Sequence, residues 1–479
     1  MGSPILMTDG YKFSMAEAGW PLRRETFYFS HRKGGLQVVP FDLAAELKAL
    51  LPTPAAGDWE YLAKNDYELG SAVKAALVDR AITIDALPKF SVFSDREPIL
   101  SVTGPSALVS WLEPLVLMWS YRIQVATTAL RTPDALGDAV KTVTCERQKQ
   151  LVLETLDAVG VKAPSITVDE AGYVARVRAR VAELIELVGA PNRIFEVGLR
   201  AASCPEQHLL ALEGAKQAGL LRTSNVHGAQ QLGLVPVGTM GHEHIQRYGS
   251  DEAAFRAMVE RRHQRSSFLL DTFDTITSGI PTAFRIIAER PGQFDSIRYD
   301  SGDKVAQYRF AIAEANKLGI RPIQILEDGF DAAQTKQFEA LREELGWKPE
   351  EQVYGYGGYI VAQTSGSTLT RDRVAAVYKL TQTGRQPTMK FGNESGSGKQ
   401  SLPGRPVLFR RRAGTMGGPF GVVGQEGEAT PQGYERLTGA PASSCVELPQ
   451  VAEADRTLGM TEGTEALVEQ LSAWKRAAT

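Results

Sequence analysis

The chain has 479 residues, of which 43% are hydrophobic and 23% are charged, and its formal net charge at pH 7 is −3. This composition is typical of a soluble globular protein with two or three domains, and the near-neutral charge argues against bulk nucleic-acid binding. No signal peptide and no apolar stretch long enough to span a membrane is recognised, so we expect a cytoplasmic protein without a membrane partner. Three cysteines far apart suggest neither a disulfide framework nor a zinc cluster.

Residues 1–140 are predicted to form an N-terminal α/β domain. Runs rich in aromatic and β-branched residues predict three strands: Thr26–His31, Lys89–Ser94 and Ile99–Thr103. Helical spacing predicts helices over Asp42–Leu51 and Tyr67–Arg80, and the apolar stretch Ala107–Tyr121 is predicted as a buried helix. The charge then rises, and residues 141–190 are interpreted as a helical connector.

One pattern repeats between Phe195 and Gly358: a short apolar run ends in polar and glycine residues, and an amphipathic stretch follows. Five such stretches are predicted helices: Pro205–Ala218, Asp251–Arg262, Ile280–Arg290, Val305–Leu318 and Ala332–Leu345. The period of roughly 30 residues is that of a βαβ unit. A further strand predicted at 374–380 brings the number of strands to as many as eight. This number favours a barrel or partial barrel, formed by residues 191–380, rather than an open sheet. The polar residues at the ends of the strands would then lie together on one rim of the barrel, where barrel enzymes have their active sites.

Several run ends contain candidate site residues, each with a structural alternative. In SIRYDSGD (296–303), Asp300 and Asp303 suit Mg²⁺ or a sugar diol and Arg298 suits phosphate, whereas the alternative is a solvated loop that caps a helix. In GTMGHEH (238–244), His242 with Glu243 fits a base or nucleophile better than a zinc ligand. Asp271 and Asp274 are interpreted mainly as scaffolding.

Phosphate ligands are predicted less specifically. YGYGG (354–358) is either a phosphate-binding loop or an ordinary tight turn, and the preceding LEDG (326–329) favours a shared site. Arg200 fits a pyrophosphate ligand and a surface arginine equally well. The late basic stretch containing Lys379, Lys390 and Lys399 is either a phosphate clamp or a solvated linker, and composition alone favours the linker.

The order of these motifs resembles that of the nicotinate phosphoribosyltransferases and the related nicotinamide enzymes. The matching segments are TDGYKFSM (8–15), FEVGLR (195–200), TSNV (223–226), GTMGHEH, LLDTFDT (269–275), YDSGD (299–303) and SLPG (401–404). The resemblance extends to about Phe409. It implies an irregular α/β barrel of the type II phosphoribosyltransferases beside the N-terminal α/β domain. Residues 381–479 would form a basic phosphate-binding loop and a C-terminal region packed on the N-terminal domain.

The resemblance also implies a reaction: nicotinate and phosphoribosyl pyrophosphate (PRPP) give nicotinate mononucleotide and pyrophosphate, as in NAD salvage. ATP hydrolysis would be coupled through a phosphohistidine at His242, with Mg²⁺ as cofactor, in a homodimer with shared active sites. Asp300 would act at the ribose and bind the metal. The implied base ligands are Tyr11 (from the neighbouring subunit), Arg200, Ser224 and Arg298. The implied PRPP ligands are Asp303, Asp328, Gly329, Gly357, Gly358, Lys379, Lys390 and Lys399.

The identity of the base is the main alternative. The nicotinamide enzymes carry an aspartate where this chain has Ser224, and a carboxylate there would repel nicotinate, so serine favours the acid. Val197 stands where relatives usually carry an aromatic residue, and LRTSN (221–225) departs from the usual glycine before TSN. These departures keep nicotinamide or another pyridine base open as substrate. A barrel that binds ligand without turnover is a third hypothesis.

Overall fold

The computed structural model describes residues 2–18, 22–391, 400–415, 417–441 and 456–478. Its first unit is a five-stranded antiparallel sheet with the order β16-β15-β1-β5-β3. The strands are β1 (Arg24–His31), β3 (Thr83–Ala86), β5 (Leu100–Pro105), β15 (Ala376–Thr383) and β16 (Gln386–Pro387). The helices of this part of the chain are α1 (Gly10–Glu17), α2 (Leu43–Leu50), α3 (Asp58–Lys64), α4 (Ser71–Val78), α5 (Ser106–Trp111) and α6 (Glu113–Arg131), of which α2, α5 and α6 pack on the sheet. The predicted strands at 26–31 and 99–103 are thus confirmed.

Two expectations for this unit need correction. The strand predicted at 374–380 does not join the barrel, because β15 pairs antiparallel with β1 from Glu25 to His31, where Phe27 and Tyr378 stack at 5.1 Å. An apolar run in the sequence indicates that a strand is buried, but it does not indicate to which sheet the strand belongs. The strand predicted over Lys89–Ser94 is reduced to β4 (Val92–Phe93), which pairs with β2 (Gln37–Val38), because the backbone of Phe90 turns to a φ of 72°.

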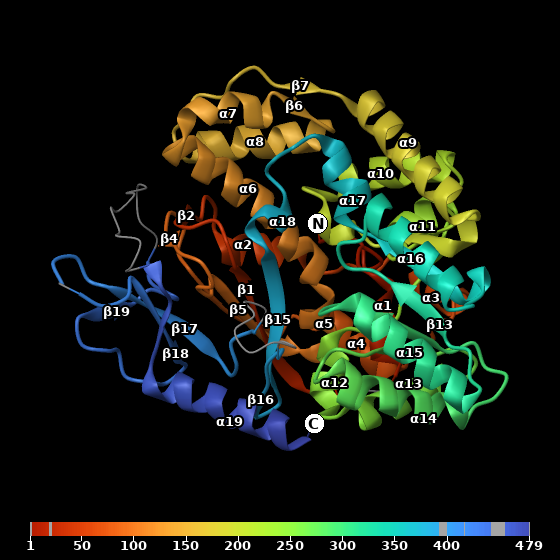
Figure 1. Cartoon of the computed structure of the whole chain (residues 1–479). Helices are drawn as coiled ribbons and strands as arrows, with labels where there is room; N and C mark the ends of the chain where they lie inside the picture. Colours follow the sequence, from red (N-terminus) through yellow and green to blue (C-terminus); the bar gives the residue numbers. More distant parts are fainter. Residues whose placement is uncertain (1, 19–21, 392–399, 416, 442–455, 479) are drawn as a thin grey trace.

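A layer of helices follows α6 and lies at the top of Figure 1. It contains α7 (Pro133–Val140), α8 (Glu146–Ala158) and α9 (Glu170–Val188), with β6 (Thr142–Val143) and β7 (Thr167–Val168) paired between them. A small apolar core of its own, which includes Val140, Val152 and Leu156, holds α6, α7 and α8 together. Helix α9 then packs against α10 of the barrel.

The barrel is a seven-stranded parallel sheet with the order β10-β9-β8-β14-β13-β12-β11. The strands are β8 (Ile194–Glu196), β9 (Arg222–Thr223), β10 (Val235–Pro236), β11 (Ser267–Leu269), β12 (Ser296–Tyr299), β13 (Ile323–Leu326) and β14 (Gln352–Tyr356). The first strand, β8, pairs with both the second and the last. The order is therefore circular, with one seam between β10 and β11 where the described residues form no ladder. This is the expected irregular α/β barrel, with seven strands.

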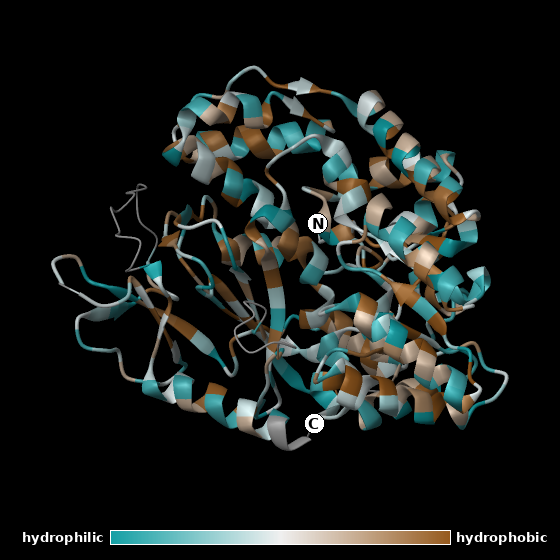
Figure 2. Ribbon diagram, viewed as in Figure 1, coloured by the Kyte–Doolittle hydropathy of each residue, from teal (hydrophilic) through white to brown (hydrophobic). Residues whose placement is uncertain are grey.

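All five predicted amphipathic stretches form helices, with ends within two residues of the prediction. Four shorter helices were not predicted, so this part of the described chain contains nine helices. They are α10 (Pro205–Gln217), α11 (Val226–Leu232), α12 (His242–Tyr248), α13 (Asp251–Arg261), α14 (Ile280–Ala288), α15 (Lys304–Leu318), α16 (Ala332–Glu344), α17 (Gly358–Val361) and α18 (Arg371–Val374). Short helical turns join them: η1 (Pro191–Arg193), η2 (Leu199–Ala201), η3 (Thr275–Gly279), η4 (Pro349–Glu351) and η5 (Gln363–Ser365). Figure 2 shows polar and apolar residues alternating along these helices, as expected for helices with one face on a sheet.

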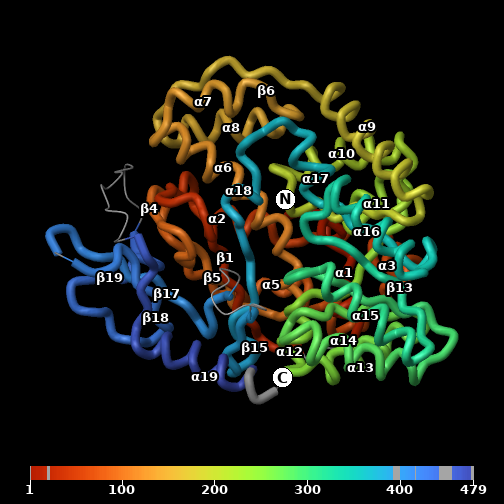
Figure 3. Tube along the Cα trace, in the orientation of Figure 1, coloured from red at the N-terminus to blue at the C-terminus, as the bar shows by residue number. Residues whose placement is uncertain are grey.

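The C-terminal part is a four-stranded sheet with one long helix. It consists of β17 (Pro406–Arg411), β18 (Gly421–Gln425), β19 (Tyr434–Arg436), β20 (Gly459–Met460) and α19 (Glu462–Ala478). Arg410 pairs with the buried Glu97 at 2.7 Å and Ser101 Oγ donates to the carbonyl of Pro406, so this sheet lies against the N-terminal unit. The tube in Figure 3 shows α19 running from that sheet towards α12. None of the helices in the described ranges has the length and hydropathy of a membrane span.

Candidate active site

A cavity of about 720 Å³ is lined by residues of both the barrel and the N-terminal unit. The carboxyl ends of the strands line it with Val197, Ser224, Asp300 and Glu327, and α1 and β15 add further side chains. The cavity also extends to the amino ends of the strands, near Ser267 and its neighbours on β12 and β13. Polar groups from motifs far apart in sequence thus meet at one rim, as a parallel barrel requires.

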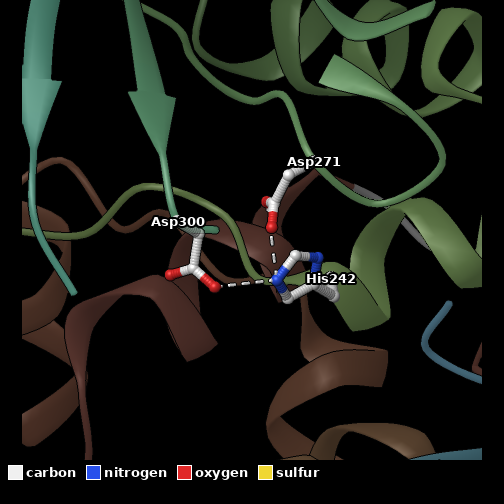
Figure 4. Close-up of side chains that lie close together, drawn as sticks. All are labelled: His242, Asp271 and Asp300. Carbon is white, nitrogen blue, oxygen red and sulfur yellow. Dashed lines mark hydrogen bonds and ion pairs between the residues drawn. The ribbon is translucent and has the colours of Figure 1, made fainter. Parts of the chain in front are cut away.

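His242 is the centre of one side of this cavity (Figure 4). It is the first residue of α12 and is buried. Its Nδ1 lies 3.0 Å from Thr272 Oγ1, whereas its Nε2 lies 3.1 Å from Asp300 Oδ2 and 3.6 Å from Asp271 Oδ1. Lys390 Nζ approaches the same Nε2 to 2.8 Å. The imidazole is therefore fixed at one nitrogen, while the other faces a cation and two carboxylates.

The charges around His242 favour a neutral imidazole beside an ionised carboxylate. Burial, and then the ammonium of Lys390, lower the pKa of His242 from its usual value. Burial alone would raise the pKa of Asp300, but Lys390, His242 and Arg298 hold it well below its usual range. A neutral imidazole has a free lone pair, which a nucleophilic histidine needs.

Arg298 lies beside this cluster, on β12. Its NH1 donates to Thr239 Oγ1 at 2.7 Å, its Nε lies 2.8 Å from Glu327 Oε1, and its NH2 lies 3.9 Å from Asp300 Oδ1. Glu327 was not singled out in the sequence, although it belongs to LEDG. Its buried carboxylate orients the guanidinium that faces the cavity.

A second group of cavity residues comes from α1 and the ends of β8 and β9. Ser224 Oγ donates to Asp9 Oδ1 at 2.6 Å, and Tyr11 OH donates to Glu113 Oε2 at 2.6 Å. Arg200 NH1 lies 3.9 Å from Glu113 Oε1. Burial raises the pKa of Asp9 above its usual value, although Ser224 and Arg200 oppose the shift. Two carboxyl groups thus hold a hydroxyl, a phenol and an arginine in place.

Tyr11 lines the cavity of its own chain, which differs from the expected contribution by a neighbouring subunit. The backbone explains this position, because Gly10 N donates to the carbonyl of Ser224. A Cβ on Gly10 would lie 2.4 Å from Val237 O, and one on Gly238 would lie 2.3 Å from Gly10 C. Two glycines therefore let α1 lie directly against the loop that leads to His242.

The predicted phosphate ligands are mostly brought together. Asp328, Gly329, Gly357, Gly358, Lys379 and Lys390 line the cavity. Asp303 does not: it is exposed and caps α15 by accepting from Ala306 N, which was its structural alternative. Lys399 lies outside the described residues. Burial lowers the pKa of Lys379 to about 7, with Lys390, Arg32 and Arg200 acting in the same direction and Glu113 opposing.

Of the remaining motif residues, His244 and Asp274 have structural roles, whereas Asp271 lies at the site. His244 is buried and bonds through Nε2 to the carbonyl of Ala254, so it belongs to the scaffold. Asp274 caps η3 as expected. Asp271, also interpreted as scaffolding, instead lies next to His242 and Lys390.

A buried chain of charges was missed in the sequence. Lys12 Nζ lies 2.6 Å from both Glu113 and Glu243, Glu243 pairs with Arg247 at 3.0 Å, and Arg247 pairs with Glu25 at 2.8 Å. The one available signal was Glu113, a charge inside the most apolar stretch of the chain. Arg32 and Arg371, which also line the cavity, gave no signal.

Comparisons with known proteins agree with this geometry. The sequence profile of the nicotinate phosphoribosyltransferase (NAPRTase) family matches residues 193–413. The nicotinate phosphoribosyltransferase pncB2 of Mycobacterium tuberculosis is 27% identical over 242 residues, 50% of this chain and 48% of that protein. The nicotinate phosphoribosyltransferase of Bos taurus is 24% identical over 481 residues, 85% of this chain and 76% of that protein. The first bacterial relatives are thus matched over about half their length.

Solved structures show the same fold. The nicotinate phosphoribosyltransferase of Porphyromonas gingivalis superposes with a TM-score of 0.59 at 18% identity, covering 84% of this chain and 96% of that one. The enzyme of Vibrio cholerae gives a TM-score of 0.56 at 17% identity, over 82% of this chain and 88% of that one. The chain is thus related to the nicotinate phosphoribosyltransferase family, by sequence over residues 193–413 and by fold over most of its length.

Proposed function

We propose that the chain is a nicotinate phosphoribosyltransferase, which joins nicotinate to PRPP and releases pyrophosphate. The observation that carries the proposal is that one cavity gathers two sets of side chains. Tyr11, Arg200 and Ser224 form one set, which we call the base side, and Arg298, Asp300 and Lys390 form the other, the phosphate side. A flat aromatic acid suits the first set and a sugar polyphosphate suits the second.

The base side fits a pyridine carboxylate. Tyr11 offers a ring face for stacking, and Arg200 offers a guanidinium for the carboxylate. Val197 lines the cavity in place of the second aromatic ring. Losing that ring removes roughly 0.5–1.5 kcal/mol of aromatic contact. We therefore expect weaker binding of the base than in a site with two rings.

The reaction needs stabilisation of charge more than proton transfer. The pyridine nitrogen carries no proton, so it attacks C1 of the ribose without a general base, while the pyrophosphate takes the electron pair of the breaking C–O bond. The ionised Asp300 is placed to stabilise positive charge that develops on the ribose. Arg298 and Lys390 are placed to neutralise the departing pyrophosphate, and the Gly357–Gly358 turn offers backbone N–H groups to the 5′-phosphate.

Mg²⁺ fits this side only in part. His242, Asp271 and Asp300 offer ligand atoms within 4.8 Å of one another, but the ammonium of Lys390 lies within 3.9 Å of all three side chains. We propose that Asp300 holds a Mg²⁺ whose other ligands are phosphate oxygens and water. The metal would screen the negative charge of the pyrophosphate.

We further propose that ATP hydrolysis is coupled through phosphorylation of His242. A neutral imidazole, with Thr272 at Nδ1, presents Nε2 to the cavity as the nucleophile for the γ-phosphate. Phosphate transfer breaks the γ-phosphate's bond to ADP and forms an N–P bond, and Lys390 lies beside the phosphoryl group so formed. Asp271 and Asp300 lie where they stabilise positive charge on the ring.

Turnover of nicotinate, PRPP, Mg²⁺ and ATP by the purified protein tests the proposal, with the mononucleotide and pyrophosphate measured separately. His242→Ala should abolish the dependence of product formation on ATP. His263→Ala, at an exposed histidine that does not itself line the cavity, is the matched control and should behave as the unaltered protein. PRPP binding without any turnover would contradict the proposed activity.

A homodimer in the cytoplasm remains part of the proposal. Tyr11 reaches its own cavity, so a second subunit is not needed to supply the stacking ring. Light scattering after size-exclusion chromatography should give twice the 52.1 kDa of one chain. Full turnover by a monomer would contradict the expectation that two subunits share each active site.

Nicotinamide, or another pyridine base, is the second candidate substrate. Asp9 favours it, because this carboxyl lines the cavity beside Ser224, whose hydroxyl donates to it, and a carboxyl oxygen can accept from an amide N–H. A panel of nicotinate, nicotinamide and quinolinate, followed by pyrophosphate release, separates the candidates. Use of nicotinamide at least as well as nicotinate would overturn the preference for the acid.

A further inference from the structure

The family match ends at residue 413, yet a later segment lies near the proposed phosphate side of the cavity. Helix α19 runs from the C-terminal sheet (Figures 1 and 3), and its far part contacts Phe273 and Phe391. Its start is fixed to that sheet, because Thr461 N donates to Val423 O and Gln425 Nε2 donates to Thr464 Oγ1. The position of its far end is therefore determined by the C-terminal sheet.

Trp474, on the far part of α19, contacts two aromatic residues from distant segments. The ring centroids of Trp474 and Phe273 lie 5.4 Å apart at 74°, an edge-to-face contact, and those of Trp474 and Phe391 lie 6.3 Å apart. Phe273 and Phe391 are 6.1 Å from one another. Both phenylalanines are buried, whereas Trp474 is 43% exposed. The indole thus covers the two phenylalanines from outside.

Each phenylalanine directly follows a residue that contacts His242. Thr272, before Phe273, lies 3.0 Å from Nδ1 of His242. Lys390, before Phe391, places its ammonium 2.8 Å from Nε2. Because the indole of Trp474 contacts both phenylalanines, it also restricts the positions of the Thr272 hydroxyl and the Lys390 ammonium. Lys475, the next residue of α19, lies 5.5 Å from the Phe391 ring and adds a second contact to the same segment.

We propose that Trp474 is a positioning residue for the phosphate side of the active site, acting through Phe273 on Thr272 and through Phe391 on Lys390. The indole contacts the two segments that supply Thr272, beside Nδ1 of His242, and Lys390, beside its Nε2. The role belongs to a part of the chain beyond the family match, and it deepens the function proposed above.

The test compares Trp474→Ala with Trp474→Phe and with Gln470→Ala, an exposed position on the same helix. The first measurement is calorimetric binding of inorganic pyrophosphate with Mg²⁺ to the full chain, which requires no turnover. We expect Trp474→Ala to bind pyrophosphate about tenfold more weakly, whereas phenylalanine restores most of the affinity. The second measurement is kinetic: KM for PRPP should rise while KM for nicotinate stays unchanged.

The outcomes separate positioning from general stability and from the proposed activity. Unchanged pyrophosphate affinity in Trp474→Ala would overturn the proposal, and so would an equal loss of both substrates with a lowered Tm. Absence of pyrophosphate binding by the unaltered chain would overturn it too, since Lys390 would then not face an anion. Weakened binding in a protein that lacks turnover would support the positioning role and contradict the proposed function alone.

Discussion

Lys379 shows how one buried side chain can make ligand binding depend on pH. Burial is the main cause that lowers its pKa to about 7. At pH 8 the amine is therefore protonated in only about a tenth of the molecules. A phosphate bound beside it would favour the ammonium, so binding should take up a proton and weaken as the pH rises above 7. We expect an uptake of about 0.9 proton at pH 8, measured by calorimetry in buffers of different ionisation enthalpy.

Two variants control this prediction. Lys379→Arg keeps the charge at every pH used, so PRPP should bind without proton uptake. Lys379→Met should bind more weakly at pH 6 than the unaltered chain and should also lose the uptake. A binding enthalpy that does not depend on the buffer in the unaltered protein would contradict the assigned ionisation.

Glu196 illustrates a residue that acts on the base side without lining the cavity. Its buried carboxylate accepts from Thr223 Oγ1 at 2.6 Å, contacts His208 Nε2 at 3.0 Å, and also accepts from Gly198 N. Gly198 and Thr223 flank Arg200 and Ser224 in the chain. The carboxylate thus fixes the two strand ends that present the base ligands.

Glu196→Gln replaces one acceptor with a donor inside this network. We expect a loss of about 1–3 kcal/mol in the free energy of unfolding, because a buried donor loses its acceptor. KM for nicotinate should rise while KM for PRPP changes little. Urea unfolding and steady-state kinetics measure the two effects, with the exposed Glu213→Gln on α10 as control. Equal changes in both KM values would argue against a role confined to the base side.

At the scale of elements, helix-forming patterns were informative and strand partners were not. The five long barrel helices repeat apolar residues at helical spacing, which is a local property of the sequence, and they form where predicted. The four short ones, α11, α12, α17 and α18, were not predicted. The run at 374–380 is equally apolar, yet it pairs with β1 more than 300 residues earlier in the chain. Its partner depends on contacts that no local pattern records. For the same reason, no local pattern predicts that β10 and β11 form no ladder with each other.

Two helices from different parts of the chain begin at cysteines that face one another. Cys145 precedes α8 and Cys204 precedes α10, and their sulfur atoms lie 3.6 Å apart in a buried site. A disulfide needs about 2.05 Å between the sulfurs, so a small shift of either helix start allows it. This proximity was not foreseen, because the residues are 59 apart in sequence.

Hydrogen peroxide should therefore join α8 to α10. The two thiols lose two electrons and two protons, the disulfide forms, and peroxide is reduced to two waters. The closed loop should stabilise the protein by about 4 kcal/mol on chain-entropy grounds. Peptide mapping and Tm, before and after a reductant, provide the measurement in a Cys445→Ser background, since Cys445 lies outside the described residues. A Tm shift that persists in Cys204→Ser would contradict this origin.

At the scale of the whole molecule, the chain of buried charges connects the N-terminal unit to the barrel. It runs from Glu113 through Lys12 to Glu243, at the second residue of α12, and on through Arg247 to Glu25 on β1. A sequence does not predict such a chain, since each member is an ordinary charged residue until the fold brings the five together. The ions hold α12, and with it His242, against the N-terminal sheet.

Lys12 lies between two carboxylates, Glu113 and Glu243, so its loss removes the cation that separates them. Burial alone would raise the pKa of Glu113 and of Glu243, but Lys12, with other cations, holds both below their usual range. In the unaltered protein these two groups therefore contribute stability above the unfolded pKa of about 4.5, and the contribution is lost as the pH falls through the folded pKa values. Lys12→Met leaves both carboxylates buried beside one another, and we expect about 3–5 kcal/mol of destabilisation at pH 7.

The pH dependence distinguishes this cause from a simple packing defect. Without the ammonium, burial and mutual repulsion should raise one folded pKa above the unfolded value, so the folded protein binds a proton that the unfolded chain does not. Stability of Lys12→Met should then increase as the pH falls from 7 to 5, whereas that of the unaltered protein should not. Urea midpoints across this range measure the trend, with the exposed Lys64→Met as control. A destabilisation that stays constant from pH 7 to 5 would assign the loss to packing, because a packing defect binds no proton.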